Sequence, residues 1–596
     1  MKPRSLLFGL ILLSFLARSA GAADWGIYGA TICAAPGDRS TSTPWSLAAP
    51  DGEGGAYMGW SDNRSGTARI FLQRVTSGGG PAAGWAFHGI PVTPWIPDRQ
   101  YGPALAADPA GGVFMVWLEG EERWEAPYPV LRVTRLGADG SPKASWPAAG
   151  VTVTTTAHSN SIPAVEPDAS GGAYVMWVGS TSAQAYAIYL HHVLGDGTLD
   201  PSWPAGALIV GQSVDPLNPA LAPDGQDGVL LAWDESRYPE DGIRYRAQRI
   251  LVNGSPAPGW DPDGVLIQTT STPNNTWRAP KITADGNGGA VVSFREFKNG
   301  EQHYGLYARR VASNGQFVAG WAAAGTPVAT TPPAVGRSTL VSDGAGGAIL
   351  FWESLEEGAG VFPPWRVWAQ RLDANGSVAS GWPSDGRRIG AADRFADKPV
   401  AVADGAGGAF VTWSDHDETG FERLRVHHVK SDASNAGGWG ADGAELAPGS
   451  PIDHSQVDAS SVFDGSQGIF AFWSDAAYPA TEVKVLGQRF DPAPPTGVGP
   501  SPGPITNGLS VHPNPAFATA TVRVRLQAAA RVSVAVHDLA GRRVRTLAEP
   551  SLVAAGETPW TWDLRDDDGR RVAPGVYRMV ARRDDGVDTA PVVVLR

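Results

Sequence analysis

The chain has 596 residues, a formal net charge of −13, and 42% hydrophobic against 18% charged residues. With 74 Gly and 49 Pro, this composition is typical of a turn-rich, all-β globular protein and excludes a disordered chain. The negative charge argues against nucleic-acid binding, because it would repel phosphates. The single cysteine excludes disulfides within the chain.

The first residues predict a secretory signal at 1–22. Lys2 and Arg4 precede an apolar run that ends at Phe15, and Ala20-Gly21-Ala22 offers small residues for cleavage. No later apolar stretch is long enough to span a bilayer. We therefore expect a protein that is secreted or held on the cell surface.

A repeat of about sixty residues fills the predicted domain at 23–490. Three markers recur in constant phase: an aspartate in an Asp-x-x-Gly-Gly-like turn, an aromatic residue nine positions later, and a second tryptophan, usually after Gly. The aspartates are Asp51, Asp108, Asp168, Asp224, Asp285, Asp343, Asp404 and Asp464. The aromatic residues are Trp60, Trp117, Trp177, Trp233, Phe294, Trp352, Trp413 and Trp473. The second tryptophans are Trp85, Trp146, Trp203, Trp260, Trp321, Trp382 and Trp439.

Each unit predicts four short strands. Examples from different units are 399–402 for the first strand, before the aspartate turn, and 409–413 for the second, after it. The third strand is exemplified by 366–372 and the fourth by 264–267. The second strand is apolar on both faces, which is typical of a sheet covered on both sides by neighbouring sheets. Third strands mostly end in tight turns such as Asn375-Gly376, which tolerate positive φ.

The eighth unit stops after its third strand, near Phe490, and the missing strand is found at the other end of the chain. Residues 25–32 resemble 85–92, so we expect this N-terminal strand to complete the last unit and to remove an exposed edge. The predicted fold is an eight-bladed β-propeller, and the repeat resembles the β-propeller superfamily. An open solenoid and two four-bladed rings are the alternatives.

A Pro/Gly-rich linker at 491–508 separates the repeat from a C-terminal domain at 509–596. Alternating runs at 521–526, 532–536 and 576–580 predict strands of an immunoglobulin-like β-sandwich. Several short motifs in this region carry a family resemblance. They are Pro513-Asn514-Pro515, Asp538-x-x-Gly541-Arg542, Trp562-Asp563, Asp568-Gly569 and Pro574-Gly575-Val576-Tyr577.

This series resembles the type A sorting domains of type IX secretion and the immunoglobulin-like domain of flagellar hook-capping proteins. The resemblance implies that the C-terminal domain is recognised by secretion machinery or attaches the protein to the outer cell surface, in a Gram-negative-type bacterium. Cleavage near the linker after export is part of the same expectation.

Two sets of residues are candidates for ligand binding at one mouth of the ring. The loop after each second strand and the loop entering each first strand lie on the same face of an antiparallel meander. An acid two positions after the aromatic recurs in six units and predicts an acidic rim, with loop capping as the alternative. These acids are Asp62, Glu119, Glu235, Glu296, Asp415 and Asp475.

The residues just before each first strand should lie near the central channel. Their variety favours ligand binding, with solvated loops as the alternative. They are Arg99, Asn160, Asn218, Trp277, Arg278, Arg337, Asp397 and Asp458.

No motif predicts a catalytic residue, a metal or a cofactor. The hypothesis is a non-catalytic propeller that binds an extracellular glycan or protein. The alternatives are a secreted polysaccharide hydrolase or lyase, which would need convergent carboxylates in a pocket, and a structural component of the envelope or of an appendage.

Overall fold

The computed structural model describes residue 25 and residues 29–594 with gaps. The gaps are 35–38, 41–46, 95, 122–127, 158–162, 183–184, 205, 214–217, 237–241, 271–278, 297–303, 331–334, 357–364, 392–393, 417–420, 437–438, 449–453, 466–467, 478–482, 491–507, 513–518, 527–528, 539–541, 555, 574 and 584–585. The predicted signal at 1–22 and nearly all of the linker lie outside the described residues. The chain divides into two compact units, Met1–Thr496 and Gly497–Arg596.

Within the described part of the first unit, the strands form eight antiparallel sheets, numbered here in chain order. Sheet 1 contains β2 (Arg39–Ser40), β3 (Ala48–Pro50), β4 (Ala56–Asp62), β5 (Arg69–Val75) and β6 (Ile90–Pro91). Sheet 2 contains β7 (Gln100–Ala107), β8 (Val113–Glu119), β9 (Val130–Leu136) and β10 (Val151–Thr154). Sheet 3 contains β11 (Ala164–Pro167), β12 (Ala173–Ser182), β13 (Ala185–Val193) and β14 (Leu208–Ser213). Sheet 4 contains β15 (Ala220–Pro223), β16 (Val229–Ser236), β17 (Ile243–Ile250) and β18 (Val265–Thr270).

The remaining four sheets follow the same order from the inner to the outer strand. Sheet 5 contains β19 (Lys281–Ala284), β20 (Ala290–Glu296), β21 (Gly305–Val311) and β22 (Thr326–Ala329). Sheet 6 contains β23 (Val335–Ser342), β24 (Ala348–Leu355), β25 (Trp365–Leu372) and β26 (Arg387–Ile389). Sheet 7 contains β27 (Phe395–Ala403), β28 (Ala409–His416), β29 (Glu422–Val429) and β30 (Ala444–Glu445). Sheet 8 contains β31 (His454–Phe463), β32 (Ile469–Ala477), β33 (Val483–Phe490) and the N-terminal β1 (Ala30–Cys33).

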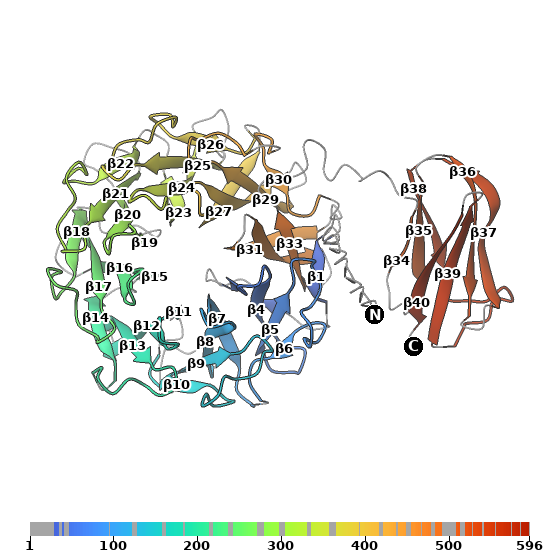
Figure 1. Ribbon diagram of the computed structural model, residues 1–596, viewed down its shortest axis with the longest axis horizontal. Coiled ribbons are helices and arrows are strands. Elements are labelled where there is room, and N and C mark those ends of the chain that lie inside the picture. Colours follow the sequence, from blue (N-terminus) through green and yellow to red (C-terminus); the bar gives the residue numbers. More distant parts are fainter. Residues whose placement is uncertain are drawn as a thin grey trace, which may run out of the picture. The chain divides into compact units, whose positions relative to one another are not determined.

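These sheets stand around a ring, as Figure 1 shows. The inner strands β3, β7, β11, β15, β19, β23, β27 and β31 each contact the next, and β31 contacts β3. Second strands such as β4, β8 and β20 are buried along their whole length, because neighbouring sheets cover both of their faces. The predicted all-β, propeller-like fold is confirmed.

The N-terminal strand closes the ring as predicted. Ala30 pairs with Gly487 and Thr31 with Leu486, so β1 is the outer strand of the last sheet. Gly29 adopts φ +76°, and a Cβ there would lie 2.7 Å from the Trp473 ring. Gly89 makes the same close approach to Trp60 in sheet 1, which explains why both segments carry glycine at this point.

The second tryptophans link neighbouring sheets at the outer edge. Trp85 Nε1 donates to the Ala138 carbonyl of the next sheet at 2.9 Å, and the corresponding indoles at five later positions do the same. Trp25, from the N-terminal segment, donates to Ser77 of sheet 1 at 2.8 Å. This set is buried, so the tryptophans serve packing rather than sugar stacking.

The turn aspartate of every sheet joins the turn to the third strand. Asp51 Oδ1 accepts the backbone N–H groups of Glu53 and Gly55, at 2.8 and 2.7 Å, and Oδ2 accepts from Arg74 at 2.9 Å. The eight pairs are Asp51–Arg74, Asp108–Arg135, Asp168–His192, Asp224–Arg249, Asp285–Arg310, Asp343–Arg371, Asp404–His428 and Asp464–Arg489. Two of the eight sheets therefore use histidine where six use arginine.

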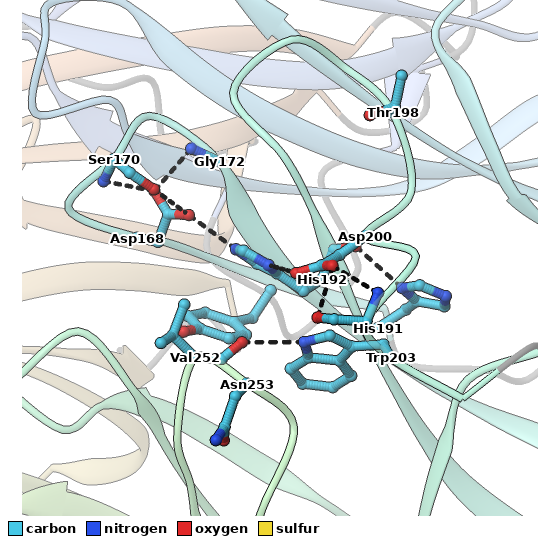
Figure 2. A network of polar contacts seen from close by, with 12 residues as sticks. Asp168, Ser170, Gly172, His191, His192, Thr198, Asp200, Trp203, Val252 and Asn253 are labelled. Carbon is cyan, nitrogen blue, oxygen red and sulfur yellow. Dashed lines mark hydrogen bonds and ion pairs between the residues drawn. The ribbon is translucent and has the colours of Figure 1, made fainter.

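His192 lies between two carboxylates (Figure 2). Its Nε2 is 2.7 Å from Asp168 and its Nδ1 is 2.8 Å from Asp200. Burial lowers the pKa of His192, but the hydrogen bonds to both carboxylates outweigh it and the net pKa is raised. Burial raises the pKa of Asp168 and Asp200, but their hydrogen bonds to His192 and neighbouring groups outweigh this effect. The net pKa of both carboxyl groups is therefore lowered.

The second unit is a β-sandwich. One sheet has the order β34 (Gly508–His512), β35 (Ala520–Leu526), β38 (Gly556–Trp562), and the other has β37 (Arg543–Val553), β36 (Ala530–His537), β39 (Gly575–Arg583), β40 (Gly586–Val594). Val522 and Trp562 of the first sheet pack in one core with Val534 and Met579 of the second. The immunoglobulin-like fold expected for this region is confirmed.

Removing the indole that anchors the N-terminal strand should open the ring. Trp25 is 3% exposed, and Trp25→Ala should lower the free energy of unfolding by about 3 kcal/mol. Cys33, which is buried in β1, should then react with a thiol reagent in native buffer. Phe87→Ala, at an aromatic that is 58% exposed, is the control and should change neither quantity. A Cys33 that reacts readily in the native wild type would contradict closure by β1.

The contacts of His192 with Asp168 and Asp200 should make the stability of the protein fall at both high and low pH. Because the folded pKa of His192 is raised, its contribution is present below about pH 6.5 and is lost as the pH rises through the raised value. Because the folded pKa values of Asp168 and Asp200 are lowered, their contribution is lost as the pH falls below about 4.

Melting temperatures between pH 4 and 9 test the alkaline side of this dependence. His192→Gln should remove the decline on the alkaline side. His191→Gln is the matched control: burial lowers the pKa of His191, so this imidazole is neutral throughout the alkaline limb and the variant should keep the wild-type slope. If the melting temperature of His192→Gln fell with rising pH as steeply as that of the wild type, His192 would not cause the alkaline decline.

Candidate functional site

The inner strands begin at the same end of the ring at which the second strands finish. Antiparallel pairing places Phe395, at the start of β27, opposite His416, at the end of β28. In the same way, Gln100 of β7 lies opposite Glu119 of β8. The two predicted sets of candidate residues therefore share one end of these sheets, as expected.

The six acids of the predicted rim are buried, with exposed fractions between 1% and 8%. Their carboxylates contact partners within the protein. Asp62 binds Arg64 and the Trp60 indole, Glu119 binds Arg132, Glu235 binds Arg246 and the Trp233 indole, Glu296 accepts from Gln268, Asp415 binds Arg425 and Arg394, and Asp475 binds His454. The prediction of an exposed acidic rim is therefore wrong.

The alternation of side chains along a strand explains why these acids are buried. A residue two positions after the aromatic is still within or at the end of the second strand and points to the same face as the aromatic. In sheets 2, 4 and 7, an arginine of the third strand covers it: Arg132, Arg246 and Arg425. These acids stabilise the end of each sheet and are not available to a ligand.

The residues predicted near the channel have different environments. Asn160, Trp277 and Arg278 lie outside the described residues. Arg99 is exposed, with its guanidinium carbon 5.3 Å from the Tyr101 ring centroid. Asn218 donates to Asp234 through its backbone and its side chain, at 3.1 and 2.9 Å.

Three of the predicted residues converge in one place, at the starts of β23, β27 and β31. Arg337, Asp397 and Asp458 lie there with four charged or titratable residues that the sequence did not single out: Glu353, Lys398, His416 and Glu422. We call these seven residues the inner-strand cluster.

Glu353 is the buried anchor of this cluster. Its Oε1 accepts the backbone N–H of Arg337 at 2.9 Å, and its Oε2 accepts the backbone N–H of Lys398 at 2.8 Å. One carboxylate thus joins the inner strands of sheets 6 and 7. Gly336 makes room for it, because a Cβ there would lie 2.4 Å from Glu353 Oε1 and 2.8 Å from the Trp365 ring.

The other members of the cluster contact one another. Lys398 Nζ is 2.7 Å from Glu422 Oε1, which also accepts from the Ser414 hydroxyl. Asp397 Oδ1 is 3.7 Å from His416 Nε2. Asp458 lies within electrostatic range of Lys398, Glu422 and Arg337, so the cluster spans sheets 6, 7 and 8.

The backbone is irregular at this point. Pairing slips between Asp397 and Val400 in β27 and between Val457 and Ser460 in β31. Lys398 and Asp458 adopt φ +53° and +57°, in the left-handed region that costs a non-glycine residue energy. Such bulges re-aim side chains and concentrate at functional sites.

Burial and charge shift the titration of the cluster. Burial raises the pKa of Glu353 and also the pKa of Asp458. The neighbouring Asp397 raises the pKa of His416. Burial lowers the pKa of Lys398, but the contact with Glu422 and the nearby carboxylates outweigh it, so its net pKa is raised.

A signal for Glu353 is present in the sequence. It occupies the position directly after the strand-two aromatic, where Asp234 and Arg295 stand in sheets 4 and 5. All three contact the start of an inner strand, since Asp234 accepts from Asn218 and Arg295 donates to the Val335 carbonyl. A charged residue at this position of an otherwise apolar strand therefore marks an inner-strand contact.

Asp397, His416 and Glu422 form the group that could hold a metal ion. Each offers one ligand atom, and the three atoms lie within 4.8 Å of one another. It is the one group of three such residues that the described part of the chain brings together.

Comparison with known proteins bears first on the second unit. Residues 514–586 match the family described as FlgD Ig-like domain. The C-terminal unit is thus similar to this domain family over most of its length. The matched residues include Trp562 of the two-sheet core described above. No curated protein sequence matches the chain.

Several solved structures resemble the chain distantly. A protein of unknown function from Dyadobacter fermentans is 11% identical, with a TM-score of 0.34 over 67% of this chain and 96% of that one. An α-L-arabinanase from Penicillium chrysogenum is 12% identical, with a TM-score of 0.35 over 67% and 96%. PorZ, a surface component of the type-IX secretion system of Porphyromonas gingivalis, is 11% identical, with a TM-score of 0.21 over 92% and 81%. These values are too low to transfer an activity.

In the described part of the chain, no helix has the length and apolar character needed to cross a membrane.

Proposed function

We propose that this protein acts outside the cell, where the propeller binds a glycan at the inner-strand cluster and the FlgD Ig-like domain directs export or surface attachment. The observation that carries the proposal is the convergence of Arg337, Asp397 and Asp458 with Glu353 and Lys398 on three adjacent sheets.

The chemistry of the cluster suits a ligand rich in hydroxyl groups. Carboxylates accept from sugar hydroxyls, and the guanidinium of Arg337, which is exposed, donates to them. Aromatic rings flank the polar groups: Trp365 lies beside Glu353, and the Phe395 ring lies 4.7 Å from His416, edge to face. Polar groups fixed among aromatic rings are typical of small-ligand sites.

Preorganisation supports the same conclusion. Glu353 fixes the backbone at Arg337 and Lys398, and register shifts aim the neighbouring side chains. Because sheets 6 to 8 are packed into the ring, a ligand there would meet groups already held in place. Such a site loses little conformational entropy on binding.

A second candidate function is hydrolysis of a polysaccharide. It is favoured by one observation: carboxyl groups with raised pKa values, at Glu353 and Asp458, lie near the carboxylates of Asp397 and Glu422. Glycoside cleavage uses a pair of carboxyl groups, and the one that acts as the acid has a raised pKa.

A glycan array probed with the full exported chain tests the binding function. We expect selective binding, and Asp458→Asn and Arg337→Ala should each weaken it at least about tenfold through loss of a charge-assisted hydrogen bond. Asp139→Asn, at an exposed hairpin turn, is the control and should bind normally. Failure of every glycan would exclude the proposal and leave a protein partner. Release of new reducing ends from a bound glycan, abolished in Asp458→Asn, would establish the hydrolase instead.

The role of the C-terminal domain is tested by transfer to a reporter. Residues 491–596 fused to an exported fluorescent protein should bring it to the outer surface or medium of a bacterium with a type IX secretion system. The fusion should stay in the periplasm of a mutant lacking that system. Arg542→Ala, at an exposed arginine paired with Asp538, is expected to reduce export without unfolding the sandwich. Equal export with and without the secretion system would overturn the sorting role.

A further inference from the structure

We propose that Asp397, His416 and Glu422 form a binding site for a divalent transition-metal ion such as Zn²⁺, Mn²⁺ or Co²⁺. The site does not depend on the glycan proposed above. It rests on the placement of three ligand atoms from the strands β27, β28 and β29 of sheet 7.

The separation between two of the ligand atoms fits a shared ion. Asp397 Oδ1 and His416 Nε2 are 3.7 Å apart, which is too long for a hydrogen bond. Ligands at about 2.0–2.2 Å from one metal ion stand roughly 3–4 Å apart across the ion. Both atoms are shut off from solvent, and neither has a hydrogen-bond partner in the described part of the chain.

The ligand types select the class of ion. Imidazole suits Zn²⁺ and other first-row transition metals, whereas Ca²⁺ and Mg²⁺ take oxygen ligands almost throughout. Two carboxylates and one imidazole would occupy three positions of a tetrahedral or octahedral coordination shell. The remaining positions are left to water or to a ligand oxygen.

The protein carries its own competing cation. The Lys398 ammonium lies 2.7 Å from Glu422 Oε1, so it neutralises the carboxylate that the metal would use. Its side chain is 36% exposed, which lets the ammonium move into solvent. When the Lys398 side chain moves away, its backbone N–H still donates to Glu353. The backbone next to Asp397 therefore keeps its position. Metal and ammonium therefore exchange at Glu422 without a change in the backbone.

This exchange gives the site a signature that a loss of folding would not produce. In calorimetric titrations of the full, chelator-treated chain with Zn²⁺ and Mn²⁺, Asp397→Asn, His416→Gln and Glu422→Gln should each weaken binding at least about tenfold. Lys398→Met should strengthen it. Bound Co²⁺ should give the visible absorption of a low-symmetry nitrogen and oxygen site, and His416→Gln should change that spectrum.

His454→Gln is the matched control, because His454 faces a single carboxylate, Asp475, in the neighbouring sheet and should leave metal binding unchanged. Three results would each overturn the site: no ion bound by the wild type, equal binding by the three ligand variants, or no gain in Lys398→Met. Glycan binding measured with and without chelator reports separately on the proposed function. Loss of metal binding with glycan binding intact would disprove this site alone.

Discussion

The carboxylate of each turn aspartate holds three parts of a sheet together. One oxygen accepts backbone N–H groups of the turn, as Asp51 does from Glu53 and Gly55, and the other binds a cation on the third strand, here Arg74. Both partners are largely buried, so loss of either would leave an uncompensated charge or unsatisfied backbone donors. This contact fixes where the first two strands turn and where the third lies. The doubly covered second strand, and with it the stacking of sheets around the ring, depends on that alignment.

The repeat made this part of the fold predictable from sequence. Aspartate, aromatic and glycine recur in constant phase, because each serves the same contact in every sheet. The likeness of residues 25–32 to 85–92 was enough to place β1 beside β33. The environment of the acids after the aromatic was not predictable in the same way. Their spacing gave the correct end of the sheet, but the arginines that cover them, such as Arg132 and Arg246, come from another strand.

The candidate site was only partly predictable for a related reason. Arg337, Asp397 and Asp458 were found because their position varies between units, which a purely structural position need not do. Glu353, His416 and Glu422 occupy strand positions. The pairing of β23 with β24 places Glu353, and the pairing of β27, β28 and β29 places His416 and Glu422, with register shifts in the inner strands. A bulge of this kind has no short sequence motif.

The closing strand sets the order of events in folding. β1 and β33 come from opposite ends of the propeller segment, so β1 has no pairing partner until the whole segment has been synthesised. Contacts this distant in sequence form late, and an open edge invites pairing with other chains. During synthesis the edge of β1 is therefore available from the start, whereas β33, its partner, is made last. Pairing of β1 with β33 closes the ring and covers its last open strand edge.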